Sequence, residues 1–427
     1  MPADPAAVPP SAPPDAPMFD PATWGLTERQ AEIAATARHL GQTRFHPRAA
    51  EVDRAAQFPR QNFDDLHASR LLAICVPEDH GGLGADLKTY ALAAAEVGRY
   101  CGATALTWNM HVCSCLWSGA LADGLEMDAA TRATHERRRA RHYARIVEAG
   151  KIYAQPFSEG GAAAAGGAAF STRAVRTEDG RWRVDGRKIF ASLAGAADYY
   201  GVLCTETTPG GEGRRRDTLY LAVPGDAPGF SVTGEWDPLG MRGTVSRDLI
   251  FEAVEVDPEE ELMPPGVYHQ AAVRWPHMFM TLTPAYLGIA QAAHDFTVRY
   301  LRGELPGMPP VKRRMYPTKQ LAVADLSIQL ETAKALWFQV MGEAQADPGR
   351  ESKLRAYACQ HTVMETAARM TQLAIRTCGG QSMLKRFHLE RLYRDARCGS
   401  LMLPWTAELC LDRLGREALY LPGESDE

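Results

Sequence analysis

Apolar residues recur at spacings of three and four along much of the chain, which is the pattern of amphipathic helices. The pattern begins near Thr27 and runs through residues 27–54 and 88–121. It predicts an N-terminal helical domain over residues 23–151. Residues 1–22 are rich in proline and alanine, and we expect them to form a flexible leader.

Between residues 152 and 267 the pattern changes to short runs of β-branched and aromatic residues, RWRVDG, YYGVLCTE, TLYLAV and DLIFEAVEV. Helical spacing then returns and predicts a C-terminal helical domain over residues 268–421, followed by a tail of residues 422–427. This order of helices, strands and helices indicates an α+β fold that is mainly α. It disfavours a doubly wound nucleotide-binding fold.

Composition and charge exclude several functions. The 427 residues are 45% hydrophobic and 23% charged, as in an ordinary globular protein. The formal net charge of -5 and the pI near 6.2 do not favour nucleic acid as a partner. No run of 18 apolar residues could span a membrane, and the N-terminus lacks the apolar core of a signal peptide. We therefore predict a cytoplasmic protein without a membrane span.

Cysteines and arginines form two groups with simple interpretations. The nine cysteines lie mostly within apolar helical patterns, and we expect reduced thiols. Only Cys113 and Cys115 are close together, with no second pair at metal-ligand spacing, so we predict no metal site. The run HERRRARHYARIVEAGK, residues 135–151, places five arginines in one predicted helix and indicates a solvated surface face.

A series of phrases in order along residues 27–421 resembles the acyl-CoA dehydrogenase family. They are FHPRAAEVDRAAQFPR, VPEDHGGLG, FSEGG, DGRWRVDGRKIFASLAGAADYYGVL, DPLGMRGTVSRDLIFEAVEV, YLGIAQAA, QLAVADL, CGGQSM and LERLYRDAR. The resemblance implies an N-terminal helical domain, a middle β-barrel or sandwich domain and a C-terminal four-helix bundle. It also implies that FAD binds between the β domain and the C-terminal helices.

The resemblance assigns the flavin ring to residues of the predicted β domain. Phe157 and Ser158 match a strand end that contacts the pyrimidine side of the isoalloxazine. Phe190 matches an aromatic residue that stacks on one face of the flavin. Ser192 matches a hydroxyl-bearing residue near the central nitrogen of the ring.

The rest of the cofactor is assigned to the C-terminal helices. Gln320, Gly379 and Gly380 match positions at the adenine and diphosphate end, where glycine lets a phosphate approach the backbone. Thr406, in the C-terminal signature, is also assigned to the cofactor.

One cofactor contact of the family involves a neighbouring subunit. The family's arginine that reaches the diphosphate bound by a neighbouring subunit falls at Glu304. A carboxylate cannot bind a phosphate in this way, so Lys312, Arg313 or Arg314 would have to replace it. Because the family completes its flavin site between subunits, we expect a homodimer or homotetramer.

The catalytic carboxylate of the family is missing from both of its usual places. In dehydrogenating members it removes the α-proton of a thioester while the β-hydrogen passes to the flavin as hydride. The alignment places Leu403 or Pro404 at the commoner position and Met278 at the alternative one. His277, next to Met278, and Glu408, one turn beyond Pro404, are the candidate bases.

Contacts to coenzyme A are altered as well. The family's acidic and basic positions on the helix before GIAQA fall at Pro276 and Phe279, and the usual Gly-Ser-Asp is replaced by GGAAAAGGAAFSTR. Arg274 and the nearby His277 are candidates to bind the substrate instead. Otherwise the acyl group arrives on an acyl carrier protein, or the substrate is not a thioester.

Three functions are compatible with these residues. The first is an FAD-dependent dehydrogenase that forms an α,β double bond in an acyl-CoA or acyl-carrier-protein thioester and passes electrons to an electron-transfer flavoprotein or another acceptor. The second is a flavin-dependent monooxygenase on the same fold, which needs no α-proton base. The third is a catalytically silent flavin-binding partner subunit.

Overall fold

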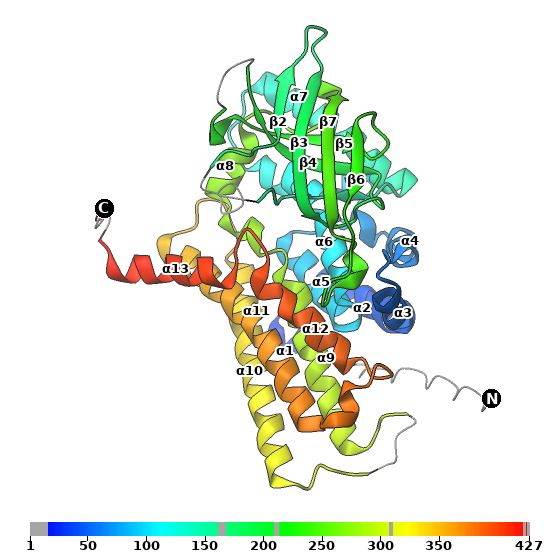
Figure 1. The fold of residues 1–427 in the computed structure, drawn as a ribbon. Helices are drawn as coiled ribbons and strands as arrows, with labels where there is room; N and C mark the ends of the chain where they lie inside the picture. Colours follow the sequence, from blue (N-terminus) through cyan, green and yellow to red (C-terminus); the bar gives the residue numbers. More distant parts are fainter. Residues whose placement is uncertain (1–15, 161–167, 209–212, 307–310, 422–423, 425–427) are drawn as a thin grey trace, which may run out of the picture.

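The computed structural model describes residues 16–160, 168–208, 213–306, 311–421 and 424. Figure 1 shows three parts: N-terminal helices, a β sheet formed by the middle of the chain, and a long bundle of C-terminal helices. The predicted α+β fold, mainly α, is therefore confirmed.

Capping residues begin several helices of the N-terminal part. The Thr27 hydroxyl accepts a hydrogen bond from the Gln30 backbone N–H, and the Gln30 side chain accepts one from the Thr27 backbone in return. The Asp86 carboxylate caps α5 by accepting from the Thr89 N–H. The main elements are α1 Pro21–Trp24, α2 Glu28–Leu40, α3 His46–Ala55, α4 Arg60–Ala68, α5 Leu87–Tyr100, α6 Gly102–Leu116 and α7 Ala129–Ala149, with π-helical turns at Gly41–Phe45 and Trp117–Leu121 and 3-10 turns at Leu71–Ala73 and Glu78–His80.

Part of the predicted leader of residues 1–22 packs into the protein. Residues 1–15 lie outside the described residues, but Met18 and Phe19 are buried. The Met18 N–H donates to Glu96 at 2.8 Å, and the Phe19 ring stacks on Trp337 with 5.4 Å between ring centroids. These apolar residues pack between the N-terminal and C-terminal helices because burial removes their surface from water. The proline-rich composition of residues 1–22 gave no sign that Met18 and Phe19 are buried.

The middle of the chain forms an eight-stranded mixed sheet. Along the sheet the strands lie in the order β6, β7, β3, β2, β4, β5 and β8, and β1 pairs with β4. β3 alternates between buried and exposed residues, whereas β4 and β5 are buried on both faces, as expected of central strands covered by other elements. The strands are β1 Tyr153–Ala154, β2 Arg173–Arg176, β3 Trp182–Ala191, β4 Tyr199–Glu206, β5 Thr218–Pro224, β6 Phe230–Thr233, β7 Arg247–Val256 and β8 Glu261–Met263.

The arginine-rich helix α7 packs against the β domain, so the prediction of a solvated face was wrong. Arg145 Nη1 lies 2.6 Å from Glu260 Oε2, and both Arg137 and Arg138 pair with Glu259. These glutamates lie in the segment that leads into β8. The arginines therefore join α7 to the sheet by ion pairs, some of them partly buried, which the run of arginines alone did not reveal.

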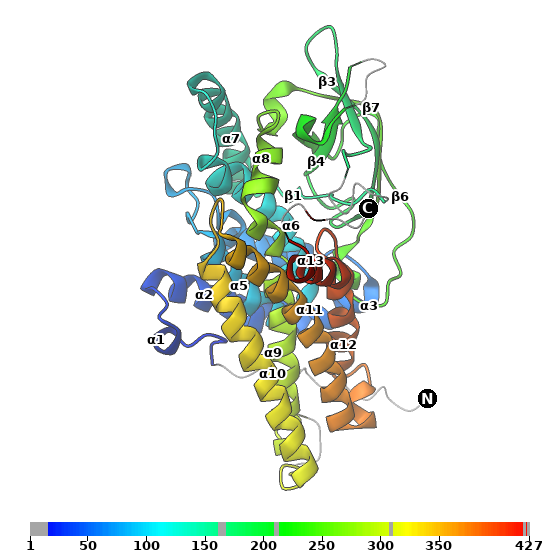
Figure 2. The same cartoon turned by 90° about the vertical axis from the view of Figure 1, so that its left-hand side faces the viewer.

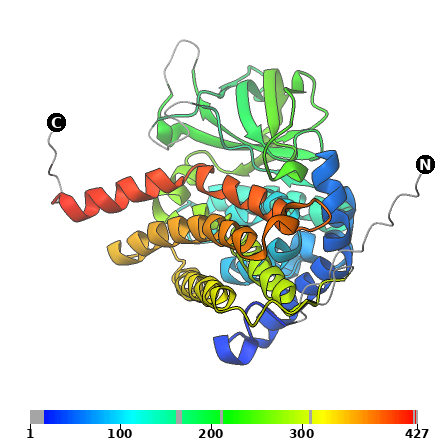
Figure 3. The ribbon, with the colours of Figure 1, turned by 60° about the horizontal axis from the view of Figure 1, so that its bottom comes forward.

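Helices α9 to α12 form the C-terminal four-helix bundle, with neighbouring helices antiparallel (Figures 1 and 2). α13 follows the bundle at the end nearest the β sheet and extends away from the bundle (Figure 3). The helices are α8 Val267–Arg274, α9 Thr283–Arg302, α10 Pro317–Gly342, α11 Arg350–Cys378, α12 Leu389–Cys398 and α13 Ala407–Leu419, with 3-10 turns at Pro276–Met280 (η9), Gly380–Met383 and Gly399–Leu401.

A close crossing of α5 and α9 joins the N-terminal helices to the bundle. An added Cβ on Gly288 would lie only 2.3 Å from the Ala95 carbonyl oxygen, and one on Gly98 would lie 2.6 Å from a carbonyl oxygen of α9. Beside this contact, Arg99 Nε donates to Asp295 Oδ2 at 2.7 Å, with both side chains almost fully buried. We call these four residues the α5–α9 seam.

We predict that Gly288→Ala destabilises the protein by about 1–3 kcal/mol, because the new methyl group overpacks the seam. Gly342→Ala, at the end of α10, is the matched control. The nearest atom to its added Cβ is the flexible Lys88 ammonium at 3.8 Å, and we expect little change in stability. Chemical denaturation of both variants measures the difference. Equal stabilities would contradict the close approach of the two helices.

Candidate functional site

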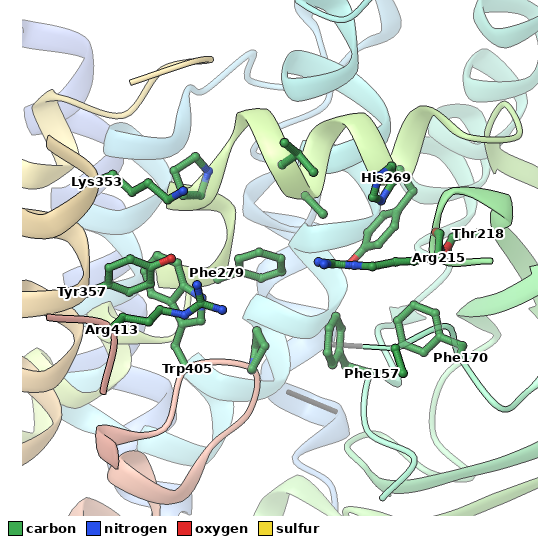
Figure 4. A pocket seen from close by; sticks show the side chains of 16 residues that line it. Phe157, Phe170, Arg215, Thr218, His269, Phe279, Lys353, Tyr357, Trp405 and Arg413 are labelled. Carbon is green, nitrogen blue, oxygen red and sulfur yellow. Dashed lines mark hydrogen bonds between the residues drawn. The ribbon is translucent and has the colours of Figure 1, made fainter. Parts of the chain in front are cut away.

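A cavity of about 220 Å³ lies where the β domain meets α8, η9, α11 and the turn before α13 (Figure 4). It is enclosed by elements that are far apart in sequence, so its shape depends on how the three parts of the chain pack together. Its walls are formed by Phe157, Ala168, Phe170, Arg215, Thr218, Tyr268, His269, Ala272, Val273, Pro276, Phe279, Lys353, Tyr357, Pro404, Trp405 and Arg413.

A row of aromatic rings runs through the cavity wall. Phe170 and Phe157 have ring centroids 5.7 Å apart, Phe157 and Phe279 6.3 Å, Phe279 and Trp405 5.8 Å, and Trp405 and Tyr357 4.4 Å. Rings at these spacings contact one another edge to face or tilted, and they give the cavity rigid, apolar sides. Such walls suit a flat or unsaturated group.

The polar groups of the cavity are mostly cationic. Arg215, Lys353 and Arg413 line it together with the imidazole of His269, and none of the described lining residues is a carboxylate. Arg215 and Arg413 extend from opposite sides with their guanidinium groups directed towards Phe279 (Figure 4). The electrostatic potential inside the cavity is therefore positive.

His269 is the titratable base of this cavity, and the sequence comparison did not single it out. Burial, together with the nearby positive charge of Arg215, lowers its pKa below the ordinary 6.5, so the ring is neutral at pH 7. The helical spacing of apolar residues around His269 could have indicated that it faces the cavity. His269, Ala272, Val273 and Pro276 are three and four residues apart, and all of them line the cavity.

The two predicted bases do not line the cavity. His277 is fully buried in η9, and among the described residues neither ring nitrogen has a hydrogen-bond partner. Burial lowers the His277 pKa to about 4. Glu408 lies in the first turn of α13, outside the cavity wall. Pro404, which with Leu403 is one of the two residues aligned with the family's base position, does line the cavity.

Two other predicted site residues have structural partners. Arg274 Nη2 lies 2.6 Å from Asp347 Oδ2, and its guanidinium also lies near Glu126. It is not part of the cavity wall. The Thr406 hydroxyl caps α13 by accepting from the Leu409 N–H at 3.3 Å. The structure therefore places Arg274 and Thr406 beside the cavity rather than in it.

The residues assigned to the flavin ring lie on the β domain near the cavity. Phe157 lines the cavity, and the carbonyl of its neighbour Ser158 accepts from the Ile189 N–H at 2.8 Å, which joins this strand end to β3. Phe190 is 70% exposed and has a positive φ of 49°. Ser192 is buried and its hydroxyl lies 2.8 Å from that of Ser246.

A buried ion pair also joins the segment after Ser158 to β3. Lys188 Nζ lies 2.6 Å from Glu159 Oε1, and both side chains are fully buried. Although burial opposes ionisation of Glu159, the positive charge of Lys188 and hydrogen bonds from Thr172 and Ser171 lower its pKa. Burial lowers the pKa of Lys188, and the charge of Glu159 opposes this shift. The contact between the two side chains joins the segment at Glu159 to β3.

The residues assigned to the adenine and diphosphate lie at the other end of the bundle. Gly379 and Gly380 follow the C-terminus of α11, whereas Tyr357, near its N-terminus, lines the cavity. Gln320 lies at the same far end, on the first turn of α10. Tyr357 and Gly379 are separated by about 33 Å along the helix axis. This length separates the cavity from the residues assigned to the adenine and diphosphate.

The cationic candidates near Glu304 also lie at this far end. Glu304 pairs with Arg302 at 2.5 Å. The Arg313 guanidinium lies over the Tyr300 ring, 5.0 Å from its centroid, and Lys312 is exposed. These cations remain available to a phosphate outside the chain.

Three further properties concern the described residues as a whole. No helix in them combines the length and the apolar character needed to cross a bilayer. The nine cysteines are free, and all but the half-buried Cys398 are buried, as their places in apolar helical patterns predict. No group of three potential metal ligands occurs in this part of the chain.

Known proteins resemble this chain along most of its length. It is 29% identical over 385 residues to the putative acyl-CoA dehydrogenase YdbM of Bacillus subtilis (strain 168), which covers 88% of this chain and 93% of that protein. Among solved structures, butyryl-CoA dehydrogenase from Megasphaera elsdenii has a TM-score of 0.77 at 24% identity, covering 92% of this chain and 99% of that one. Dibenzothiophene monooxygenase (TdsC) from Paenibacillus sp. A11-2 has a TM-score of 0.76 at 22% identity, covering 91% and 97%.

Three family models match consecutive parts of the chain. The N-terminal domain of acyl-CoA dehydrogenase matches residues 27–122, the middle domain residues 157–254 and the C-terminal domain residues 280–401. Together they cover well over half of the sequence, in the order that the phrases of the sequence indicated. The chain belongs to the acyl-CoA dehydrogenase family, a family of flavoprotein oxidoreductases.

Proposed function

We propose that the chain is an FAD-dependent dehydrogenase that forms an α,β double bond in an acyl thioester, with His269 as the proton acceptor. The position of His269 is the observation that carries this proposal. Its imidazole lines a cavity that also contains Phe157 and Pro404, which match the family's flavin and base positions. A catalytically silent subunit, the third hypothesis, would lack a proton acceptor in this cavity, whereas this cavity contains His269.

Several features of the chain fit a bound flavin. Phe190 exposes most of its ring and has a strained backbone conformation, a combination typical of ligand sites. Ser192 places a hydroxyl two residues further along the same strand end. An added Cβ on Gly379 or Gly380 would meet no atom within 4 Å, so the backbone there is open to a phosphate. The flavin, when bound, supplies the acceptor for a hydride from the β-carbon.

The residues of the cavity then accept the proton and bind the substrate. His269 is neutral at pH 7, so a ring nitrogen is free to accept the α-proton. The aromatic row holds the acyl group in a space with little room for water. The thioester is carried by coenzyme A or by an acyl carrier protein, and the electrons pass to an electron-transfer flavoprotein or to another acceptor.

A flavin-dependent monooxygenase is the second candidate, and one observation favours it. Pro404, one of the two residues that the alignment gives to the family's base position, lines the cavity, and no carboxylate is among the described residues of the cavity wall. An enzyme whose reduced flavin reacts with oxygen needs no such base. The fold is compatible with this chemistry, because the dibenzothiophene monooxygenase TdsC shares it.

The distance between the two cofactor regions supports a homodimer or a homotetramer in which each FAD is held by two subunits. The exposed apolar side chains of α10 support the same assembly, since Leu321 and Ile328 are 71% and 67% exposed. An apolar helix face of this kind is typical of a surface that a second subunit covers.

We predict that light scattering of the flavin-loaded protein shows a dimer or a tetramer. Ile328→Arg places a charge on the exposed face of α10 and should both reduce the size of the assembly and release flavin. A monomer that retains flavin would contradict the shared site.

We predict that Phe190→Ala weakens flavin retention about fivefold or more, because a stacking contact of roughly 1 kcal/mol is lost. Phe190→Trp keeps an aromatic face and is the matched control, for which retention should be close to that of the original protein. Flavin fluorescence after dialysis measures both. Equal retention by the Ala and Trp variants would mean that this side chain does not contact the ring.

We predict that His269→Gln lowers the rate of flavin reduction by an acyl thioester by about 10²–10⁴-fold while flavin stays bound, because the general base is removed. The neutral imidazole is the active form and its pKa lies below 6.5. The rate of the original protein should therefore rise with pH through a value below 6.5 and stay constant above it. Anaerobic stopped-flow measurements test both statements.

His277→Gln provides the comparison. If this variant loses flavin reduction and the His269 variant does not, the base is His277. If the flavin of the original protein is reduced only by an external reductase and never by a thioester, the monooxygenase replaces the dehydrogenase.

A further inference from the structure

The cavity brings three positive charges together without a negative charge to balance them. Among the described residues no carboxylate lies within ion-pair distance of Arg215, Lys353 or Arg413, although many other arginines of the chain are paired. In the segment RRRD, Arg214 and Arg216 lie near Asp217. Arg215, between them, extends into the cavity instead (Figure 4).

Like charges that converge on one space repel each other, and because Arg215, Lys353 and Arg413 are exposed, water and salt screen part of this repulsion. Arg413 and Lys353 approach from the wall opposite Arg215 (Figure 4). Lys353 lies in the first turn of the long helix α11, whose positive dipole end adds to the potential. An anion in the cavity would relieve this repulsion.

Tyr268 adds an independent observation. Its side chain is buried and lines the cavity, yet its hydroxyl has no hydrogen-bond partner among the described residues. Burial raises the Tyr268 pKa far above 10, so the hydroxyl stays protonated and is a donor. A buried O–H without an acceptor is costly, and an oxygen atom of a ligand would satisfy it.

We propose that the cavity binds a substrate with a flat aromatic or unsaturated body and an acidic group, a carboxylate or a phosphate, on that body. The aromatic row of Phe157, Phe279 and Trp405 contacts the body, and the guanidinium groups of Arg215 and Arg413 bind the acidic group. Tyr268 donates its hydroxyl to one of the oxygens. The proposal rests on the proposed function only in taking this cavity as the substrate site.

Small aromatic probes test the proposal without any turnover. Benzoate and phenyl phosphate carry the two acidic groups on the same ring, and benzamide is the neutral counterpart of benzoate. Calorimetric titration of the flavin-loaded protein should show that at least one of the two anions binds about tenfold or more tightly than benzamide, since hydrogen bonds to charged groups are the stronger ones. The preferred anion identifies the acidic group.

Variants of α13 show where the anion binds. Arg413→Gln should weaken binding of the preferred anion about tenfold and leave benzamide unchanged, and Arg413→Lys should restore part of the affinity. Arg416→Gln is the matched control: it removes the same charge one turn further along, from a residue that pairs with Asp412 outside the cavity. Its anion affinity should equal that of the original protein.

Two results would overturn the proposal: equal binding of all three probes, or anion binding that Arg413→Gln and Arg215→Gln leave unchanged. Failure of the proposed function is recognised separately. If His269→Gln reduces its flavin at the original rate while benzoate or phenyl phosphate still binds through Arg413, the acidic substrate stands and the assignment of the base does not.

Discussion

The α5–α9 seam is the constraint on which the rest of the structure depends. Two helices can approach until backbone meets backbone only where both lack side chains at the crossing, and Gly98 and Gly288 provide this. The buried pair of Arg99 and Asp295 fixes the position along the helices, since breaking it would leave an uncompensated charge inside the protein. Because η9 and α8 precede α9 directly, the seam also fixes Phe279 and the face of α8 that carries His269.

The β domain is held in place by charges of a different kind. Ion pairs between α7 and residues 259–261 attach one side of the sheet to the helices. The buried pair of Glu159 and Lys188 holds the strand end at Phe157 beside β3, with Lys188 Nζ 4.3 Å from the centre of the Phe170 ring. Removing one member of such a pair costs about 3–5 kcal/mol. The aromatic row of the cavity therefore depends on contacts behind it as much as on its own stacking.

The arrangement of helices and strands could be predicted from the sequence because periodicity and turn residues record local structure. Phe157, which lies in a recognisable phrase, and Pro404, one of the two residues aligned with the base position, both line the cavity. His269 was missed, since it matches no phrase, and its role follows only from which face of α8 meets the cavity. His277, one position from a known base position in sequence, is fully buried and is not among the residues that line the cavity.

The loss of the family's carboxylate, which the alignment places at Leu403 or Pro404, is consistent with the positive charge of the cavity. A glutamate at this position would face Arg413 and Arg215, and their charges would lower its pKa and weaken it as a base. It would also compete with any acidic group of the substrate for the same guanidinium groups. The charge of Arg215 also lowers the pKa of the His269 imidazole, but a neutral imidazole forms no ion pair with a guanidinium and accepts a proton without first leaving a cation. Proline at residue 404 and histidine at residue 269 thus leave the arginines free for the substrate.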